Sequence, residues 1–122
     1  MKIAITSTGK TLDSQVDQRF GRAAYFIIVE TQTMDFNVLE NENAAAVGGA
    51  GISAARAMTD AGAEAVLTGN CGPNAAQTLT AAGIKLYTAV AGTVAKAVEL
   101  FKSGRLTEAP GPNVQAHFEI DK

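Results

Sequence analysis

The sequence has few of the residues that build disulfide frameworks and metal centres. Its 122 residues include one cysteine, one histidine and no tryptophan, and aromatic residues make up 6% of the chain. A single cysteine cannot form an internal disulfide, which agrees with a reducing compartment, and we expect a cytoplasmic protein. Neither a CxxC nor an HxxxH pair accompanies it, so a closed structural zinc site is not expected.

The charge pattern disfavours nucleic acid, and the hydropathy pattern disfavours a membrane. Ten lysines and arginines are scattered among twelve acidic residues, which gives a net charge of -2 and no basic run. We therefore expect no nucleic-acid partner. Charges or glycines interrupt every apolar run, so no membrane segment is expected. The first five residues enter a strand pattern directly and lack the charged and apolar regions of a signal peptide.

The apolar content of the chain is sufficient for one compact domain. Hydrophobic residues make up 47% and charged residues 18% of the sequence, which excludes a disordered chain, and the length suits a single core. We expect one α/β domain over residues 1–104. Residues 105–122 contain Pro110 and Pro112 and have no sustained helical or strand period, which predicts a peripheral tail.

Hydrophobic periodicity predicts five strands and three helices. The predicted strands are 2–7, 24–30, 36–40, 65–68 and 84–88, and the predicted helices are 52–61, 74–82 and 94–102. The connector 31–35 is too short for a parallel crossover, so the strands on either side of it should form an antiparallel hairpin. The strand–helix–strand unit over 65–88 should be parallel and right-handed. This order predicts a three-layer α/β/α domain around a mixed five-stranded sheet.

One strand-to-helix turn, Thr68-Gly69-Asn70-Cys71-Gly72-Pro73-Asn74-Ala75, has the composition of an anion-binding loop. Its glycines and the following helix start direct backbone N–H groups at one point. The same loop carries the only cysteine, so a small anionic ligand or a soft metal is expected there. Cys71 itself has two interpretations. It is either a small buried hydrophobe or a thiol activated by the helix terminus, which would ligate metal or act as a nucleophile.

Three further features carry weaker signals. The turn Gly48-Gly49-Ala50-Gly51 matches neither the dinucleotide nor the Walker pattern. It is either a steric turn or a second helix start that offers N–H groups to an anion. Arg19 and Arg22 are either solvated loop charges or guanidinium donors to an anionic ligand. His117, in the predicted tail, is interpreted as a surface histidine.

Four motifs together resemble the dinitrogenase iron-molybdenum cofactor biosynthesis family. They are DQRFGRA at 17–23, GGAG at 48–51, TGNCGPNA at 68–75 and GTV at 92–94. The resemblance covers residues 1–104 and implies a ribonuclease-H-like fold without nuclease activity. It also implies a binding role, because the family includes carriers of the iron-molybdenum cofactor and the orange-protein type, which holds a molybdenum-copper sulfide cluster non-covalently. The chain departs from many nitrogenase-associated members, which have a histidine in the segment where this sequence has Asn43 and alanines.

We therefore expect a small soluble protein, without catalytic activity, that binds or carries an anionic molybdenum-containing metal-sulfur cluster. The cluster would be of the iron-molybdenum or molybdenum-copper type, and a protein partner would be a cluster donor or an ATPase. The alternatives are a Cys71-dependent enzyme and a regulatory interaction module without a cluster. Cys71 is also the one candidate metal ligand. The residues expected around the cluster are Arg19, Phe20, Gly21, Arg22, Asn43, Gly48, Gly49, Gly51, Gly69, Asn70, Cys71, Gly72 and Asn74.

Overall fold

The computed structural model describes residues 1–42 and 49–113 and contains the expected order of elements. The strands are β1 (Lys2–Ser7), β2 (Tyr25–Glu30), β3 (Phe36–Glu40), β4 (Ala65–Leu67) and β5 (Lys85–Tyr87). The helices are α1 (Ala50–Asp60), α2 (Pro73–Ala81) and α3 (Val94–Lys102). Helix α1 begins two residues earlier than predicted, because Gly49 is its N-cap and adopts a left-handed conformation with φ of 75°.

The five strands form one mixed sheet in the order β3-β2-β1-β4-β5. The pairs β1–β2 and β2–β3 are antiparallel, whereas β4 pairs in parallel with β1 and with β5. The predicted hairpin and the predicted parallel crossover are thus both confirmed. The sheet and its three helices form the mixed α/β domain that the sequence predicted, with the ribonuclease-H-like fold that the family resemblance implied.

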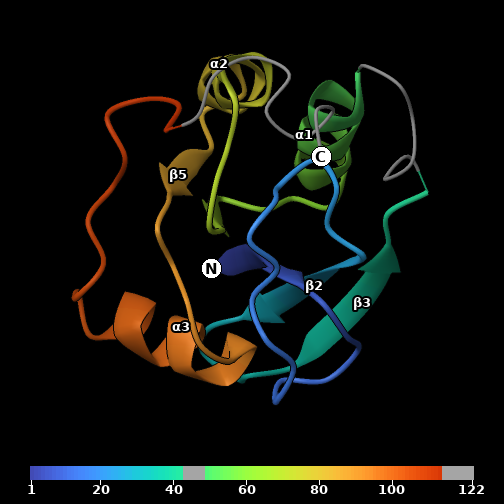
Figure 1. The fold of residues 1–122 in the computed structure, drawn as a ribbon. Helices are drawn as coiled ribbons and strands as arrows, with labels where there is room; N and C mark the ends of the chain where they lie inside the picture. Colours follow the sequence, from blue (N-terminus) through green and yellow to red (C-terminus); the bar gives the residue numbers. More distant parts are fainter. Residues whose placement is uncertain (43–48, 114–122) are drawn as a thin grey trace.

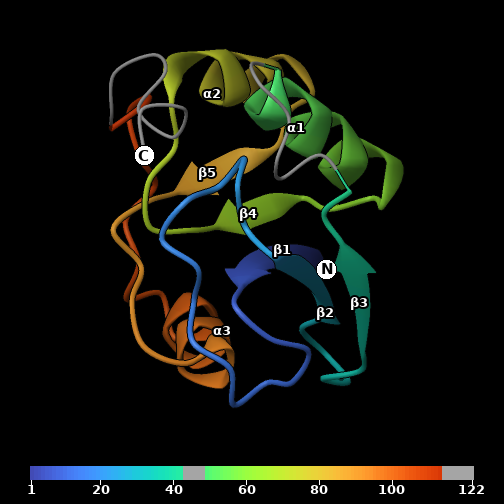
Figure 2. The same ribbon diagram turned by 45° about the vertical axis from the view of Figure 1, so that its right-hand side comes forward.

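Helices cover both faces of the sheet. Helices α1 and α2 lie side by side on one face, and α3 lies on the other (Figures 1 and 2). Successive residues of β1 point to opposite faces, so Ala4 packs in the core under α1 and α2, while Ile3 and Ile5 pack in the core on the side of α3. Within the described residues, none of the helices has the length and apolar character needed to cross a bilayer.

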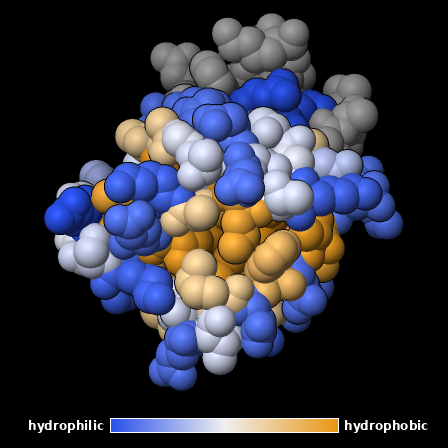
Figure 3. Space-filling view, turned by 90° about the horizontal axis from the view of Figure 1, so that it is seen from below, coloured by the Kyte–Doolittle hydropathy of each residue, from blue (hydrophilic) through white to orange (hydrophobic). Residues whose placement is uncertain are grey.

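The surface on the side of α3 carries an apolar area. Seen from below, hydrophobic residues gather near its centre and hydrophilic residues surround them (Figure 3). A groove of about 410 Å³ on this side is lined by Met34 together with Ala95, Val98 and Lys102 of α3. This groove therefore lies between α3 and the turn that joins β2 to β3.

Part of the predicted tail packs against the domain. The backbone N–H of Ala109 donates a hydrogen bond of 2.7 Å to the carbonyl of Leu86 in β5, and Ala109 packs against the core on the side of α1 and α2. The boundary at residue 104 stays a prediction. Residues 105–113 nevertheless lie along β5 and return toward the start of α2, which brings them to the candidate site.

Candidate functional site

The predicted site residues follow the carboxyl ends of two neighbouring parallel strands. The chain leaves β1 for β2 on one side of the sheet and leaves β4 for β5 on the other side. The loops after β1 and β4 therefore diverge from adjacent strand ends. In open α/β sheets, such a point is where ligands bind, because the diverging loops leave a crevice between them. The arginine motif follows β1 and the cysteine motif follows β4.

The arginine loop, residues 17–24, is fixed to the strand ends by buried polar contacts. Thr6 Oγ1 lies 2.7 Å from the carbonyl oxygen of Asp17 and 2.9 Å from Thr68 Oγ1. The Asp17 carboxylate accepts hydrogen bonds from the backbone N–H groups of Arg19 (3.1 Å) and Ala24 (3.3 Å). Asp17 thus connects the two ends of the arginine loop and fixes the backbone position of Arg19.

The arginine loop and the loop after β4 are joined backbone to backbone. Arg19 and Asn70 form a parallel bridge, in which Asn70 N donates to Gln18 O (2.8 Å) and Phe20 N donates to Asn70 O (3.0 Å). Gly69 makes this approach possible, since a Cβ at residue 69 would lie 2.7 Å from the Cα of Gln18. The sequence motifs 17–23 and 68–75 therefore form one continuous structure.

Close glycine contacts also bring the starts of α1 and α2 to the same place. A Cβ at Gly21 would lie 2.8 Å from the backbone N of Gly51. A Cβ at Gly51 would in turn lie 3.1 Å from the Cβ of Ala75, in the first turn of α2. Asn41 secures the other side of the arginine loop, because its Nδ2 donates to the carbonyls of Gly21 and Ala23, both at 2.9 Å.

The two helix starts at this edge differ from that of α3. Thr93 caps α3 and accepts a hydrogen bond of 3.1 Å from the backbone N–H of Lys96. In the described part of the chain, the N-caps of α1 and α2 are Gly49 and Gly72, with no side-chain cap and no acidic residue in either first turn. First-turn N–H groups have no intrahelical acceptor and form the positive end of the helix dipole. Both helix starts therefore offer donors to an anion.

Basic side chains accompany these donors. Arg19 and Arg22 are both half-buried on the arginine loop. Lys10 does not join them: its ammonium lies 5.6 Å from the centre of the Tyr25 ring, and Tyr25 alternates with Phe26 along β2, so it faces the side of α3. Over residues 1–42 and 49–113, no group of three or more His, Cys, Asp or Glu side chains is placed to hold a metal ion. This donor set suits an anion and does not suit a bare metal cation.

The thiol of Cys71 lies inside the protein. Cys71 is fully buried in the core under α1 and α2, and its Sγ lies 3.7 Å from the carbonyl oxygen of Gly72. Its backbone N–H donates a hydrogen bond of 2.7 Å to Asn113 Oδ1. Burial in apolar surroundings is typical of a structural cysteine rather than a reactive one. Phe20 is also fully buried, and its ring centre lies 5.8 Å from that of Phe26.

Most of the predicted residues thus meet at one edge of the sheet. Asn43, Gly48 and His117 lie outside the described residues. Sequence reasoning missed the residues that support the loops, namely Thr6, Asn41 and Asn113, because no motif or periodicity distinguishes them. The described residues that the structure brings together are Arg19, Phe20, Gly21, Arg22, Gly49, Gly51, Gly69, Asn70, Cys71, Gly72 and Asn74.

Fold and site together define a small ribonuclease-H-like α/β protein whose loop glycines, helix starts and arginines converge at the switch point of the sheet. The sequence model of the family described as "dinitrogenase iron-molybdenum cofactor" matches residues 1–104, and the chain belongs to this family. Its resemblance to that family, inferred from the motifs, is therefore confirmed. Members of the family are accessory proteins associated with this cofactor.

Individual relatives support the same assignment. The chain is 43% identical to the orange protein from Desulfovibrio gigas, solved in its apo form, with a TM-score of 0.91 over 93% of this chain and 96% of that one. It is also 43% identical to a putative NifB protein from Thermotoga, with a TM-score of 0.77 over 88% of this chain and 91% of that one. An uncharacterized protein from Methanocaldococcus jannaschii is 26% identical over 110 residues, which are 87% of this chain and 93% of the relative.

Proposed function

We propose that this protein binds and carries a preassembled, anionic metal-sulfur cluster that contains molybdenum. The observation that carries the proposal is the convergence of two helix starts without side-chain caps on the arginine loop at the switch point. The orange-protein likeness and the family name direct the choice of anion toward a molybdenum cluster.

The chemistry of the site fits a preassembled cluster better than a metal ion assembled on the protein. Sulfide and thiomolybdate groups carry their negative charge on the outside, where backbone N–H groups and guanidinium groups can donate to them. Such a cluster keeps its own metal–sulfur bonds and requires few protein ligands. Clusters of the molybdenum-copper and iron-molybdenum types share this chemistry, and both would use the same donors.

The role that follows is carriage without catalysis. A non-covalently held cluster can be received from one protein and released to another, so the protein partner would be a cluster donor or an ATPase that drives the transfer. We place this exchange in the cytoplasm.

The alternative function, a Cys71-dependent enzyme, requires an accessible thiolate, and the burial of Cys71 weighs against it.

Reconstitution tests the proposal. The purified protein is mixed anaerobically with tetrathiomolybdate and a copper(I) salt, desalted, and examined by visible absorption and metal analysis. We expect a retained charge-transfer absorption with molybdenum and copper bound. Removal of one guanidinium by Arg19→Ala or Arg22→Ala should weaken retention about tenfold or more, since a hydrogen bond to a charged group contributes about 1.5–3 kcal/mol.

Two control variants sharpen the result. Arg105→Ala removes an exposed arginine beyond the end of α3 and should leave cluster retention unchanged. Cys71→Ser tests direct ligation by the thiol, and we expect the cluster to be retained, because the buried side chain faces the core. A colourless wild-type protein, or an equal loss in all three arginine variants, would count against a specific site at this edge.

A further inference from the structure

Asn113 ties the segment after α3 to the loop that follows β4. Its Oδ1 accepts the N–H of Cys71 (2.7 Å), and its own N–H donates to Cys71 O (3.1 Å). Its Nδ2 donates to Gly69 O (3.1 Å) and to Asn70 Oδ1 (3.2 Å). One amide group has two N–H donors, so both of the last two hydrogen bonds can form together. A single residue therefore contacts three consecutive residues of the loop.

These hydrogen bonds extend from Asn113 to the arginine loop. Because Asn70 Oδ1 accepts from Asn113, the amide of Asn70 is oriented with its Nδ2 toward Gln18 O, at 3.0 Å. The backbone of Asn70 pairs with Gln18 and with Phe20, on either side of Arg19. Asn113 thus holds the backbone of residues 69–71, which leads directly into α2 and pairs with the residues on either side of Arg19.

The segment that carries Asn113 has an anchor of its own. Ala109, four residues before Asn113, donates a backbone hydrogen bond to Leu86 in β5 and packs against the core. The family match ends at residue 104, so this support lies beyond the matched part of the chain. The segment therefore holds the loop from a fixed position on the sheet.

We propose that Asn113 is a positioning residue for the anionic cluster, holding residues 69–71 so that the N–H groups at the start of α2 and the arginine loop face the cluster together. This inference rests on the function proposed above. Backbone donors that point at a ligand must be held in place by neighbouring residues. Loss of a residue that orients the groups in contact with a bound metal typically lowers metal affinity by about 10–100-fold.

The test compares Asn113→Ala with Thr107→Ala, an exposed position in the same segment. Three quantities are measured on the full chain: the dissociation constant for the tetrathiomolybdate–copper(I) cluster, the visible circular dichroism of the bound cluster, and the exchange rates of the Asn70 and Cys71 amides without cluster. For Asn113→Ala we expect affinity to fall about tenfold or more, the dichroism to change, and the Cys71 amide to exchange faster. Thr107→Ala should match the wild type in all three.

The outcomes separate this inference from the proposed function. Wild-type binding together with unchanged affinity and dichroism in Asn113→Ala would overturn the positioning role. Tighter binding by Asn113→Ala would also overturn it, because Asn113 Oδ1 would then compete with the cluster for the Cys71 N–H. If the wild type itself takes up no cluster, the proposed function fails and the cluster-positioning role fails with it, whereas the amide exchange still reports whether Asn113 holds the loop.

Discussion

Gly21 is the position where a single added methyl group should disturb both stability and the site. The Cβ of an alanine there would lie 2.8 Å from the N and 2.9 Å from the Cα of Gly51, and 3.2 Å from the carbonyl carbon of Ala50. These atoms belong to the backbone of the first turn of α1, which cannot rotate aside as a side chain can. The Gly21→Ala variant must therefore push α1 away from the arginine loop.

The expected cost of this overpacking is about 1–3 kcal/mol of unfolding free energy. An unfolding entropy of about 2.1 cal/mol/K per residue, taken over the 122 residues of the chain, means that each kcal/mol lowers the melting temperature by about 4 °C. Urea denaturation and thermal melting followed by far-ultraviolet circular dichroism measure both quantities. The displaced helix start should also weaken cluster retention, so stability and binding should fall together.

Gly111→Ala is the matched control. A Cβ at Gly111 has no neighbour within 4 Å, and Gly111 has no positive φ, so the substitution should be neutral or stabilise by up to about 1 kcal/mol through the unfolded chain. A Gly21→Ala protein within about 0.5 kcal/mol of the wild type, which is the range of ordinary surface changes, would show that the contact between the arginine loop and α1 is loose. The close-approach account of the glycine motifs would then be wrong.

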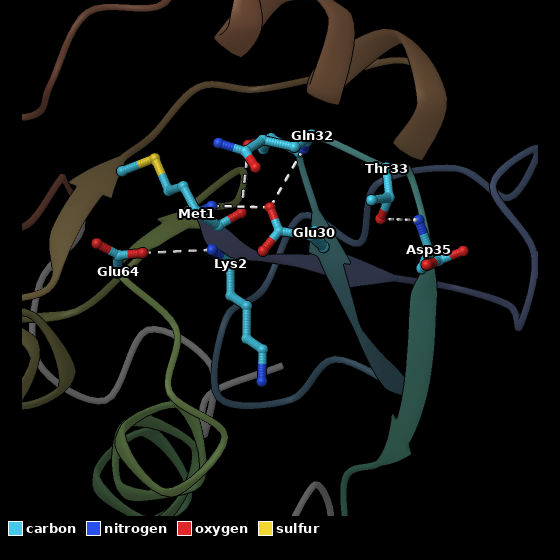
Figure 4. Close-up of polar contacts among 8 residues, drawn as sticks. Met1, Lys2, Glu30, Gln32, Thr33, Asp35 and Glu64 are labelled. Carbon is cyan, nitrogen blue, oxygen red and sulfur yellow. Dashed lines mark hydrogen bonds and ion pairs between the residues drawn. The ribbon is translucent and has the colours of Figure 1, made fainter.

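Two further substitutions test supporting contacts. Asp17→Asn replaces one of the two carboxylate oxygens that accept from the N–H groups of Arg19 and Ala24 with an NH2 donor. The unfolding free energy measured by urea denaturation at pH 7 should fall by about 1–3 kcal/mol, with weaker cluster retention. Glu30 accepts from the N-terminal ammonium at 2.7 Å and from Gln32 N at 3.2 Å, which lowers its pKa below the ordinary 4.5 (Figure 4). A lowered pKa stabilises the fold above pH 4.5, and this contribution is lost as the pH falls through the lowered value. Melting temperatures of wild type and Glu30→Gln should therefore differ at pH 7 and converge in acid; an equal gap at every pH would contradict the linkage.

The fold was predictable because its signals are local. Apolar runs of strand length, a five-residue connector and glycine stops define each element without reference to the rest of the chain. The error at the start of α1 has a local cause as well. The glycines at positions 49 and 51 disfavour a helix in the sequence, yet Gly49 in the left-handed conformation is the N-cap of a helix that begins at Ala50. Tertiary contact with Gly21 explains why small residues stand there.

The supporting residues of the site were not predictable in the same way. Arg19 and Asn70 are about fifty residues apart in sequence, and only the parallel pairing of β1 with β4 brings their loops together. Cys71 is buried in a core to which both α1 and α2 contribute, so its burial follows from the tertiary fold and not from its own loop. Asn113 follows a proline- and glycine-rich stretch without periodicity, so nothing in the sequence marks it as a partner of Cys71.

The glycines of the three motifs have a different role from the one their loop positions suggest. Gly21, Gly51 and Gly69 do not mainly leave room for a ligand. A methyl group at Gly21 would meet α1, one at Gly51 would meet α2, and one at Gly69 would meet Gln18. They let backbone segments approach until the two helix starts and the arginine loop share one edge. The protein thus assembles its candidate anion site by packing, and we expect the guanidinium groups and first-turn N–H groups, rather than the thiol, to recognise the cluster.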